Sequence, residues 1–333
     1  KHTGSGAAIA LSSDGTSLLL DGTAIGGGGG DPDLYRDNLD AGATTPSATG
    51  SNAVSIGSGS SSSGLLSIAF GYAATSTAQC STAIGASSGL AGSRAIANGA
   101  VALGGSSASG VNSFAAAIAS NSASYGATGS SSVAIGQNAK ASHSTAVALG
   151  GSYNTSSGPR SVTLGGEVNT ASAENSYAFG VRSVADKIGQ YAFGNWIGQQ
   201  GGLMVLQAAT TNATPKAMSS SSSGASYNNQ LILPNNSAYS FSGTIIARQQ
   251  AADGSNYASW EIKGALLRDA NAASTVLGNG IVNKLFATAG ASAWAIALTA
   301  DTTNGGLKIE ATGAAATDIR WVATVNTSEV TYA

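Results

Sequence analysis

Paired carboxylates are the first chemistry to look for, because hydrolysis of a glycosidic bond needs two of them within roughly 5 to 10 Å. Residues 41–166 contain neither Asp nor Glu. A pair would have to come from Glu167 and Glu174, or from Asp253 and Glu261. Glu167 and Glu174 lie within a repetitive region and are offset by half a repeat. We therefore predict no catalytic residues and a protein that is not an enzyme.

The sequence also contains few candidate residues for nucleophilic catalysis or metal binding. His2 and His143 are the only histidines, and no acid lies near His143 in sequence to orient its imidazole, as a Ser-His-Asp arrangement requires. The single Cys80 can form neither an intrachain disulfide nor a Cys-rich zinc site, and we expect it to be a small buried filler. An acidic cluster resembles a calcium loop but lacks Gly at the sixth position and Glu at the twelfth; it consists of Asp31, Asp33, Asp37 and Asp40. We predict no metal and no cofactor.

Binding is a better prospect than catalysis at one turn in the last third of the chain. Asp253 and the glycine after it form a turn signal, and Asn256 and Tyr257 follow closely. An amide can hydrogen-bond a sugar hydroxyl, and a tyrosine ring can stack on the apolar face of a sugar. The alternative is that these residues only pack their own hairpin. Our candidate receptor-binding residues are Asp253, Asn256 and Tyr257.

The composition limits the elements that could position such residues. The chain of 333 residues has 46 glycines, 9% charged residues and a net charge of −2. So few charges, with no basic cluster, argue against nucleic acid as a partner. Small side chains argue against an ordinary enzyme with a large aliphatic core, and the low net charge argues against intrinsic disorder. Regular repetition is the remaining way to order this chain.

A repeat is plain in residues 54–194. The pattern apolar, small, apolar, Gly recurs from Val54-Ser55-Ile56-Gly57 to Tyr191-Ala192-Phe193-Gly194, mostly at a spacing of 14 or 15 residues. Each unit is too short for a helical hairpin, but it accommodates two short strands and two turns. Glycines would supply the positive φ that each corner needs. The repeat predicts a thin, parallel β-roll or solenoid over residues 51–198.

The two faces of each repeat strand differ. In Val133-Ala134-Ile135-Gly136 and its equivalents, Val and Ile or Leu share one face, while Ala, Ser or Thr occupy the other. The small face could press against another surface, which suits a strand buried on both sides. A coil this narrow buries little apolar area by itself, so we expect several chains to associate closely.

The flanking regions have different patterns. In residues 1–50, short apolar runs around Leu11 and Leu18 flank the turn signal Asp14-Gly15, which predicts an N-terminal β-hairpin that attaches and caps the roll. Residues 199–228 are predicted to be a polar linker. Residues 229–333 contain strand-sized, mostly alternating segments that predict an antiparallel, jelly-roll-like β-sandwich as a tip domain; they are 231–233, 241–248, 259–266, 294–298, 307–311 and 319–325. The predicted fold class is all-β.

Two parts of the chain resemble known families. The segments Ser132–Ala139 and Thr145–Gly150 resemble the head repeats of trimeric autotransporter adhesins. That resemblance implies a left-handed parallel β-roll with three chains side by side, over about residues 52–198. The segments Tyr239–Gly243, Thr299–Leu307 and Ile319–Val325 resemble the C-terminal domains of bacteriophage tail fibre proteins.

Together the resemblances imply a homotrimeric, extracellular tail fibre of a virion. Its tip would bind a host cell-surface glycan or protein, and its N-terminal segment would bind other tail or baseplate proteins. No coiled-coil stalk or membrane anchor follows the last third, which favours this interpretation over a bacterial surface trimeric adhesin fragment. A second alternative is a polysaccharide depolymerase tailspike. The chain opens on Lys1 rather than Met, as a processed piece of a longer protein would.

Overall fold

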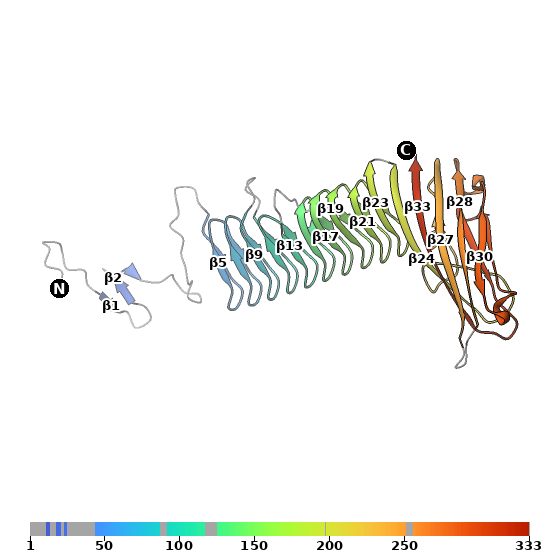
Figure 1. Ribbon diagram of the computed structural model, residues 1–333. Helices are drawn as coiled ribbons and strands as arrows, with labels where there is room; N and C mark the ends of the chain where they lie inside the picture. Colours follow the sequence, from blue (N-terminus) through green and yellow to red (C-terminus); the bar gives the residue numbers. More distant parts are fainter. Residues whose placement is uncertain are drawn as a thin grey trace.

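The computed structural model describes residues 44–86, 92–116, 125–196, 198–250 and 256–332, and three short strands that precede them. These three, β1 (Leu11–Ser13), β2 (Leu18–Leu20) and β3 (Thr23–Ala24), form an antiparallel sheet, with β1 and β2 paired where the sequence predicts a hairpin. The other described residues form a repetitive shaft, residues 44–196, and a tip, residues 198–332 (Figure 1). The predicted all-β fold is confirmed.

Each coil of the shaft contributes one strand to each of two parallel sheets, as the predicted β-roll requires. The short-strand sheet consists of β4 (Ser47–Ala48), β6 (Ser61–Ser62), β8 (Thr75–Ser76), β10 (Arg94–Ala95), β12 (Ser107–Ala108), β14 (Gly126–Ala127), β16 (Lys140–Ala141), β18 (Thr155–Ser156), β20 (Thr170–Ala171) and β22 (Val184–Ala185). The long-strand sheet begins with β5 (Val54–Ile56), β7 (Ile68–Phe70), β9 (Thr82–Ile84), β11 (Val101–Leu103), β13 (Phe114–Ala116), β15 (Val133–Gln137), β17 (Val147–Ser152), β19 (Val162–Glu167), β21 (Tyr177–Val181) and β23 (Tyr191–Trp196).

The interior of the shaft is built from the smallest side chains. Every buried hydrophobic residue in the described part of the shaft is an alanine, and buried serines supplement them. In β15, Ala134 is buried, whereas Val133 and Ile135 are only half-buried. The expectation that the small face contacts another surface is therefore wrong. The two strands of one coil lie too close together for a larger side chain, so the small face fills the coil and the aliphatic face lies outside.

An additional glycine distinguishes 15-residue coils from 14-residue coils. The pairs Gly150-Gly151 and Gly165-Gly166 all have positive φ, and each begins a 15-residue coil. Asn154 Nδ2 donates to the carbonyls of Gly150 and Gly165, at 2.8 and 2.9 Å. Asn169 makes the equivalent bonds one coil later. The asparagines thus satisfy carbonyls that the additional residue turns inward.

The sequence predicts glycine at each corner, but several corners use other residues. Cys80, Thr145, Arg160 and Asn175 adopt left-handed φ between 54° and 55° at equivalent corners. That conformation costs a non-glycine residue roughly 1–2 kcal/mol. The amide of Thr145 donates to the carbonyl of Ser130 in the preceding coil at 2.8 Å, and the other three make equivalent bonds. Hydrogen bonding between stacked coils therefore offsets the backbone strain.

The long-strand sheet continues without interruption into the tip, where it becomes antiparallel and reaches sixteen strands (Figure 1). Its tip strands are β24 (Gln199–Thr210), β33 (Ile319–Thr331), β27 (Ser237–Gln249), β28 (Tyr257–Arg268), β29 (Val276–Leu277) and β30 (Ile281–Ala287). A second sheet contains β25 (Lys216–Ala217), β32 (Gly306–Thr312), β26 (Leu231–Ile232) and β31 (Ala295–Asp301). Two short 3-10 helices, η1 (Ala272–Ser274) and η2 (Ala289–Ala291), lie in the connections.

Large side chains fill the space between the two tip sheets. The Trp321 ring lies between those of Trp260 and Trp294, with centroid distances of 5.4 and 5.9 Å, and all three are buried. Leu206 from the large sheet and Ile309 from the second sheet belong to the same core. The tip is therefore an antiparallel sandwich with a conventional hydrophobic core.

The start of the tip differs from the predicted polar linker. Residues 199–210 form β24, which pairs with β23 on one side and β33 on the other. The strand begins with the polar segment Gln199-Gln200-Gly201-Gly202, which is not typical of a strand. Its inward residues Met204 and Leu206 are nevertheless buried. The division of the chain into domains otherwise remains a prediction.

Candidate functional site

The junction between shaft and tip contains a hydrogen-bonded cluster centred on Gln200 of β24. Its side-chain Oε1 accepts from the Val184 amide at 2.9 Å, and its Nε2 donates to the Val184 carbonyl at 3.1 Å. Val184 belongs to β22, the last strand of the short-strand sheet. The Gln200 amide therefore acts as a substitute for the next strand and caps a sheet edge that would otherwise be open.

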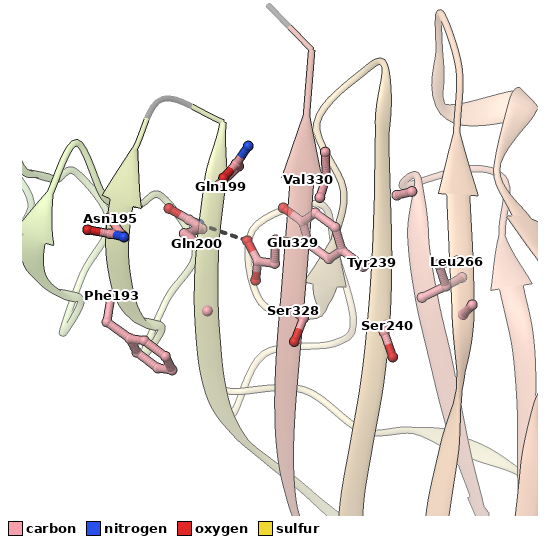
Figure 2. Close-up of a pocket in the computed structure, with 13 residues that line it drawn as sticks. Phe193, Asn195, Gln199, Gln200, Tyr239, Ser240, Leu266, Ser328, Glu329 and Val330 are labelled. Carbon is pink, nitrogen blue, oxygen red and sulfur yellow. Dashed lines mark hydrogen bonds between the residues drawn. The ribbon is translucent and has the colours of Figure 1, made fainter.

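Glu329 of β33 holds this capping side chain in place. Its Oε2 accepts from Gln200 Nε2 at 2.7 Å (Figure 2). Its Oε1 accepts from Thr327 Oγ1 at 2.5 Å. The residue is only 4% exposed. Burial raises the pKa of the Glu329 carboxyl, while hydrogen bonds from Thr327, Gln200 and Tyr239 act in the opposite direction. Burial, and then the charge of Glu329, raise the pKa of the Tyr239 hydroxyl.

A hollow of about 550 Å³ lies across β23, β24, β33, β27 and β28 beside this cluster (Figure 2). Phe193 and Asn195 line it on the shaft side, and small residues such as Ser240 and Ser328 line it on the tip side. Glu329 is the single carboxylate of the lining. Aromatic, amide and hydroxyl groups can stack on and hydrogen-bond a polar ligand, whereas hydrolysis by two carboxylates would need a second acid from outside the lining.

The predicted receptor-binding corner is only partly visible. Asp253 lies outside the described residues. Asn256 donates to Gln249 Oε1 at 2.8 Å and accepts from Thr288 Oγ1 at 3.1 Å, so its amide ties neighbouring segments together. Tyr257 is exposed and its ring stacks on Phe286 at a centroid distance of 5.0 Å. The receptor-binding role of this corner remains a prediction.

The other candidate residues are dispersed. Glu174 forms a salt bridge with Arg160, and Glu167 ends β19. His143 lies exposed in a shaft turn, where its Nδ1 accepts from the Ser144 amide at 2.8 Å. Cys80 is exposed, so its assignment as a buried filler is wrong; its corner position turns it outward. Other candidates lie outside the described residues: His2, Asp31, Asp33, Asp37 and Asp40.

No cluster of three or more metal-ligating side chains occurs in the part of the chain that the structure describes. Within that same part, no helix has the length and apolar character that a bilayer crossing requires.

Comparison with protein families identifies the shaft repeats. Two segments, residues 62–88 and 127–152, match the model of the YadA head domain repeat. Both lie within the shaft, where stacked coils form its two parallel sheets. The shaft is therefore a β-roll of the kind found in trimeric autotransporter heads. No curated protein sequence shows significant similarity to the chain.

Two solved structures of phage proteins are similar to the chain. One is the tailspike protein gp49 of Acinetobacter baumannii bacteriophage Fri1, described as a capsular polysaccharide depolymerase; it has 10% sequence identity and a TM-score of 0.23, covering 68% of this chain and 40% of that one. The other is the tailspike of Acinetobacter phage vB_ApiP_P1, with 10% identity and a TM-score of 0.23, covering 83% of this chain and 54% of that one. The chain thus spans less than two thirds of either tailspike.

These similarities correct one expectation. The prediction that the protein is not an enzyme is wrong, because a structure similar to this chain is described as a capsular polysaccharide depolymerase. At a TM-score of 0.23 the similarity assigns no activity to this chain either.

Proposed function

We propose that the protein is a homotrimeric fibre of a phage tail that attaches the virion to the surface of its host. The shaft would hold three chains together, and the tip would contact a glycan or protein on the host cell. The N-terminal segment would join other tail or baseplate proteins. In this proposal the protein is extracellular and forms part of the virion.

The observation that carries the proposal is the aliphatic outer face of the shaft. Ile84, Leu164, Phe179 and Phe193 occupy equivalent positions of the repeat, and each is at least 40% exposed in the single chain. Apolar patches of this extent are uncommon on soluble monomers and mark interaction surfaces. Because apolar residues recur at this position along the shaft, the face suits a partner with the same repeat, which is a second copy of this chain.

The charge distribution supports the same arrangement. Arg94 is the single charged residue between positions 41 and 139, so this part of the surface has little charge to keep monomers apart. Three shafts packed along their aliphatic faces would leave the outward residues of the short-strand sheet, such as Thr75, Thr155 and Thr170, facing water. The match of two shaft segments to the YadA head repeat is consistent with a trimer.

Sedimentation equilibrium of the purified chain tests the assembly. We expect a species close to three times the chain mass of 32.2 kDa. A monomer at micromolar concentration would contradict the proposal. Attachment is then tested by incubating the labelled trimer with host cells and with cells stripped of surface glycans. Measuring reducing ends in the same incubation decides whether glycan cleavage accompanies binding.

A further inference from the structure

The aliphatic outer face does not end with the shaft. Phe193 of β23 pairs in register with Gly201 of β24, which pairs with Ser328 of β33, which pairs with Ser240 of β27. Partners directly opposite each other in a sheet point to the same face. The outer face of the shaft is therefore continuous with the outer face of the large tip sheet, as the unbroken sheet indicates (Figure 1).

The tip part of this face carries its own row of exposed apolar side chains. Val322 pairs with Ile246, Ile246 pairs with Ser259, and Ser259 pairs with Phe286, so the row crosses four neighbouring strands. Val322, Ile246 and Phe286 are between 42% and 48% exposed in the single chain. The opposite faces of β33, β27 and β28 are buried in the tip core, whereas β30 is exposed on both faces. The row, which we call the tip row, consists of the exposed Val322, Ile246 and Phe286 and of the half-buried Ser259 between them.

We infer that the tip row is an interface between copies of this chain, so that the tips as well as the shafts pack together in the trimer. This inference rests on the proposed homotrimer. The sheet that carries the shaft face also carries the tip row, so chains that align along their shafts bring their tip rows to the same side. At about 4.8 Å per strand, the shared face is about 70 Å long. A stable interface buries roughly 800 Å² per partner, which a face of that length can supply.

The residues around the tip row fit the border of an interface between copies. Charged side chains of both signs lie on the same outer face in neighbouring rows; they are Arg248, Glu261, Lys263 and Arg320. An apolar centre with a polar border is the usual composition of protein interfaces. A glycan would instead need several hydrogen-bonding groups at the centre, where the Ser259 hydroxyl stands among the apolar side chains of Val322, Ile246 and Phe286.

This arrangement changes where host contact would occur. Tyr257 stacks on Phe286 and therefore lies at the border of the tip row, close to the neighbouring copy. The second tip sheet, with β31 and β32, would face outward on the opposite side. Ala297 and Thr299 of β31 are exposed there.

Thiol accessibility tests the inference without disrupting the assembly. In a Cys80→Ser background, single cysteines replace Ile246 or Val322 in the tip row, and Ala297→Cys is the matched control on the opposite sheet. Each variant is sedimented and then treated with a maleimide, and the modification rate is followed by mass spectrometry. We expect trimers in which the tip-row cysteines react at least about tenfold more slowly than the control, equivalent to roughly 1.4 kcal/mol of protection. All three rates should become equal in denaturant.

The outcomes separate the inference from the function on which it rests. Equal native rates in a trimeric sample would overturn the inference and leave the proposed trimer intact. If the wild-type chain sediments as a monomer, both the trimer and the tip interface are wrong.

Discussion

In the described residues of the shaft, alanine is the only hydrophobic residue that becomes buried, whereas the tip buries three tryptophans and long aliphatic side chains such as Leu206 and Ile245. A buried methyl group contributes about 0.8 kcal/mol. Ordering the backbone of one residue costs roughly 1–2 kcal/mol. The tip can offset this entropy cost by burying side chains in its own core. A coil of the shaft must in addition bury its outer face against another chain. The shaft therefore depends on other chains in a way that the tip does not.

The largest expected effect comes from placing charge on the outer face of the shaft. Leu149 and Leu164 pair in register on β17 and β19. In the double variant Leu149→Asp/Leu164→Asp, each trimer would bury six carboxylates, each with a desolvation penalty of several kcal/mol. We expect complete loss of the trimer by sedimentation, while the tip keeps its tryptophan fluorescence.

The matched control lies on the other sheet of the same coils. Thr155 and Thr170 pair in register on β18 and β20 of the short-strand sheet. The variant Thr155→Asp/Thr170→Asp adds the same charges to a face that we expect to meet water, so the trimer should persist. If both double variants dissociate equally, the contrast between the two faces of the shaft is wrong.

The next prediction perturbs the tip instead of the shaft, by removing the central side chain of the tip core. Trp321 is buried between Trp260 and Trp294, and its Nε1 donates to Thr210 Oγ1 at 3.0 Å. Trp321→Ala should destabilise the tip by about 3–5 kcal/mol through cavity formation. In thermal unfolding, the transition reported by near-UV circular dichroism should move to lower temperature, while the trimeric shaft remains. Trp321→Phe should give a smaller shift, and simultaneous loss of the shaft would contradict the independence of the two regions.

The repeat made most of the shaft predictable from sequence, but not the orientation of its strands. Alternation in Val133-Ala134-Ile135 assigns residues to two faces without saying which face is inside. That choice depends on the distance between the two strands of a coil, which the sequence pattern does not contain. In the tip, six strands were predictable from alternation and turn signals, whereas β24, β25, β29 and β30 were not. The long strand β24 was missed because it begins with two glutamines and two glycines.

A smaller effect concerns the asparagines that distinguish the coils within the shaft. Asn169 Nδ2 donates to the carbonyls of Gly165 and Gly180, and its Oδ1 accepts from the amide and hydroxyl of Ser183. Asn169→Ala would leave buried groups unpaired, each costing about 1–3 kcal/mol. We expect the unfolding midpoint of the shaft to fall in denaturant.

Deleting one glycine should reverse that effect. Removing Gly166 together with the Asn169→Ala change produces a 14-residue coil like the one that has Ala139 at the equivalent position. We expect this double change to recover most of the lost stability, because no carbonyl then needs the asparagine. A double variant that is less stable than Asn169→Ala alone would disprove the link between the additional glycine and the asparagine.

The junction cluster shows where prediction from sequence fails for the site. Gln200 and Glu329 are 129 residues apart, and their contact depends on the antiparallel pairing of β24 with β33. One signal was present: the inward positions of β33 run through Trp321, Val325 and Thr327 to Glu329, which places an acid in a buried series. The predicted corner at Tyr257 followed from local turn signals, which contain no information about such distant pairs.

The smallest expected effect is the pH dependence of the joint between shaft and tip. Burial raises the pKa of Glu329, so the native state binds its proton more tightly than the unfolded state. The stability from this group is complete below the ordinary glutamate pKa of about 4.3 and is lost as pH rises through the raised native value. Glu329→Gln should remove that slope, as measured by the unfolding midpoint across mildly acidic to neutral pH.

Asp301 provides the opposite control within the tip. Burial acts against its ionisation, but hydrogen bonds from Asn304 and Thr303 outweigh burial and lower its pKa. Its contribution is therefore present above the ordinary aspartate pKa and is lost as pH falls through the lowered native value. Asp301→Asn should flatten the pH dependence of the unfolding midpoint at acidic pH. Glu329→Gln should flatten it between mildly acidic and neutral pH. If Glu329→Gln instead leaves the loss of stability toward neutral pH unchanged, the carboxylate ionises without penalty in the native state, and burial does not raise its pKa.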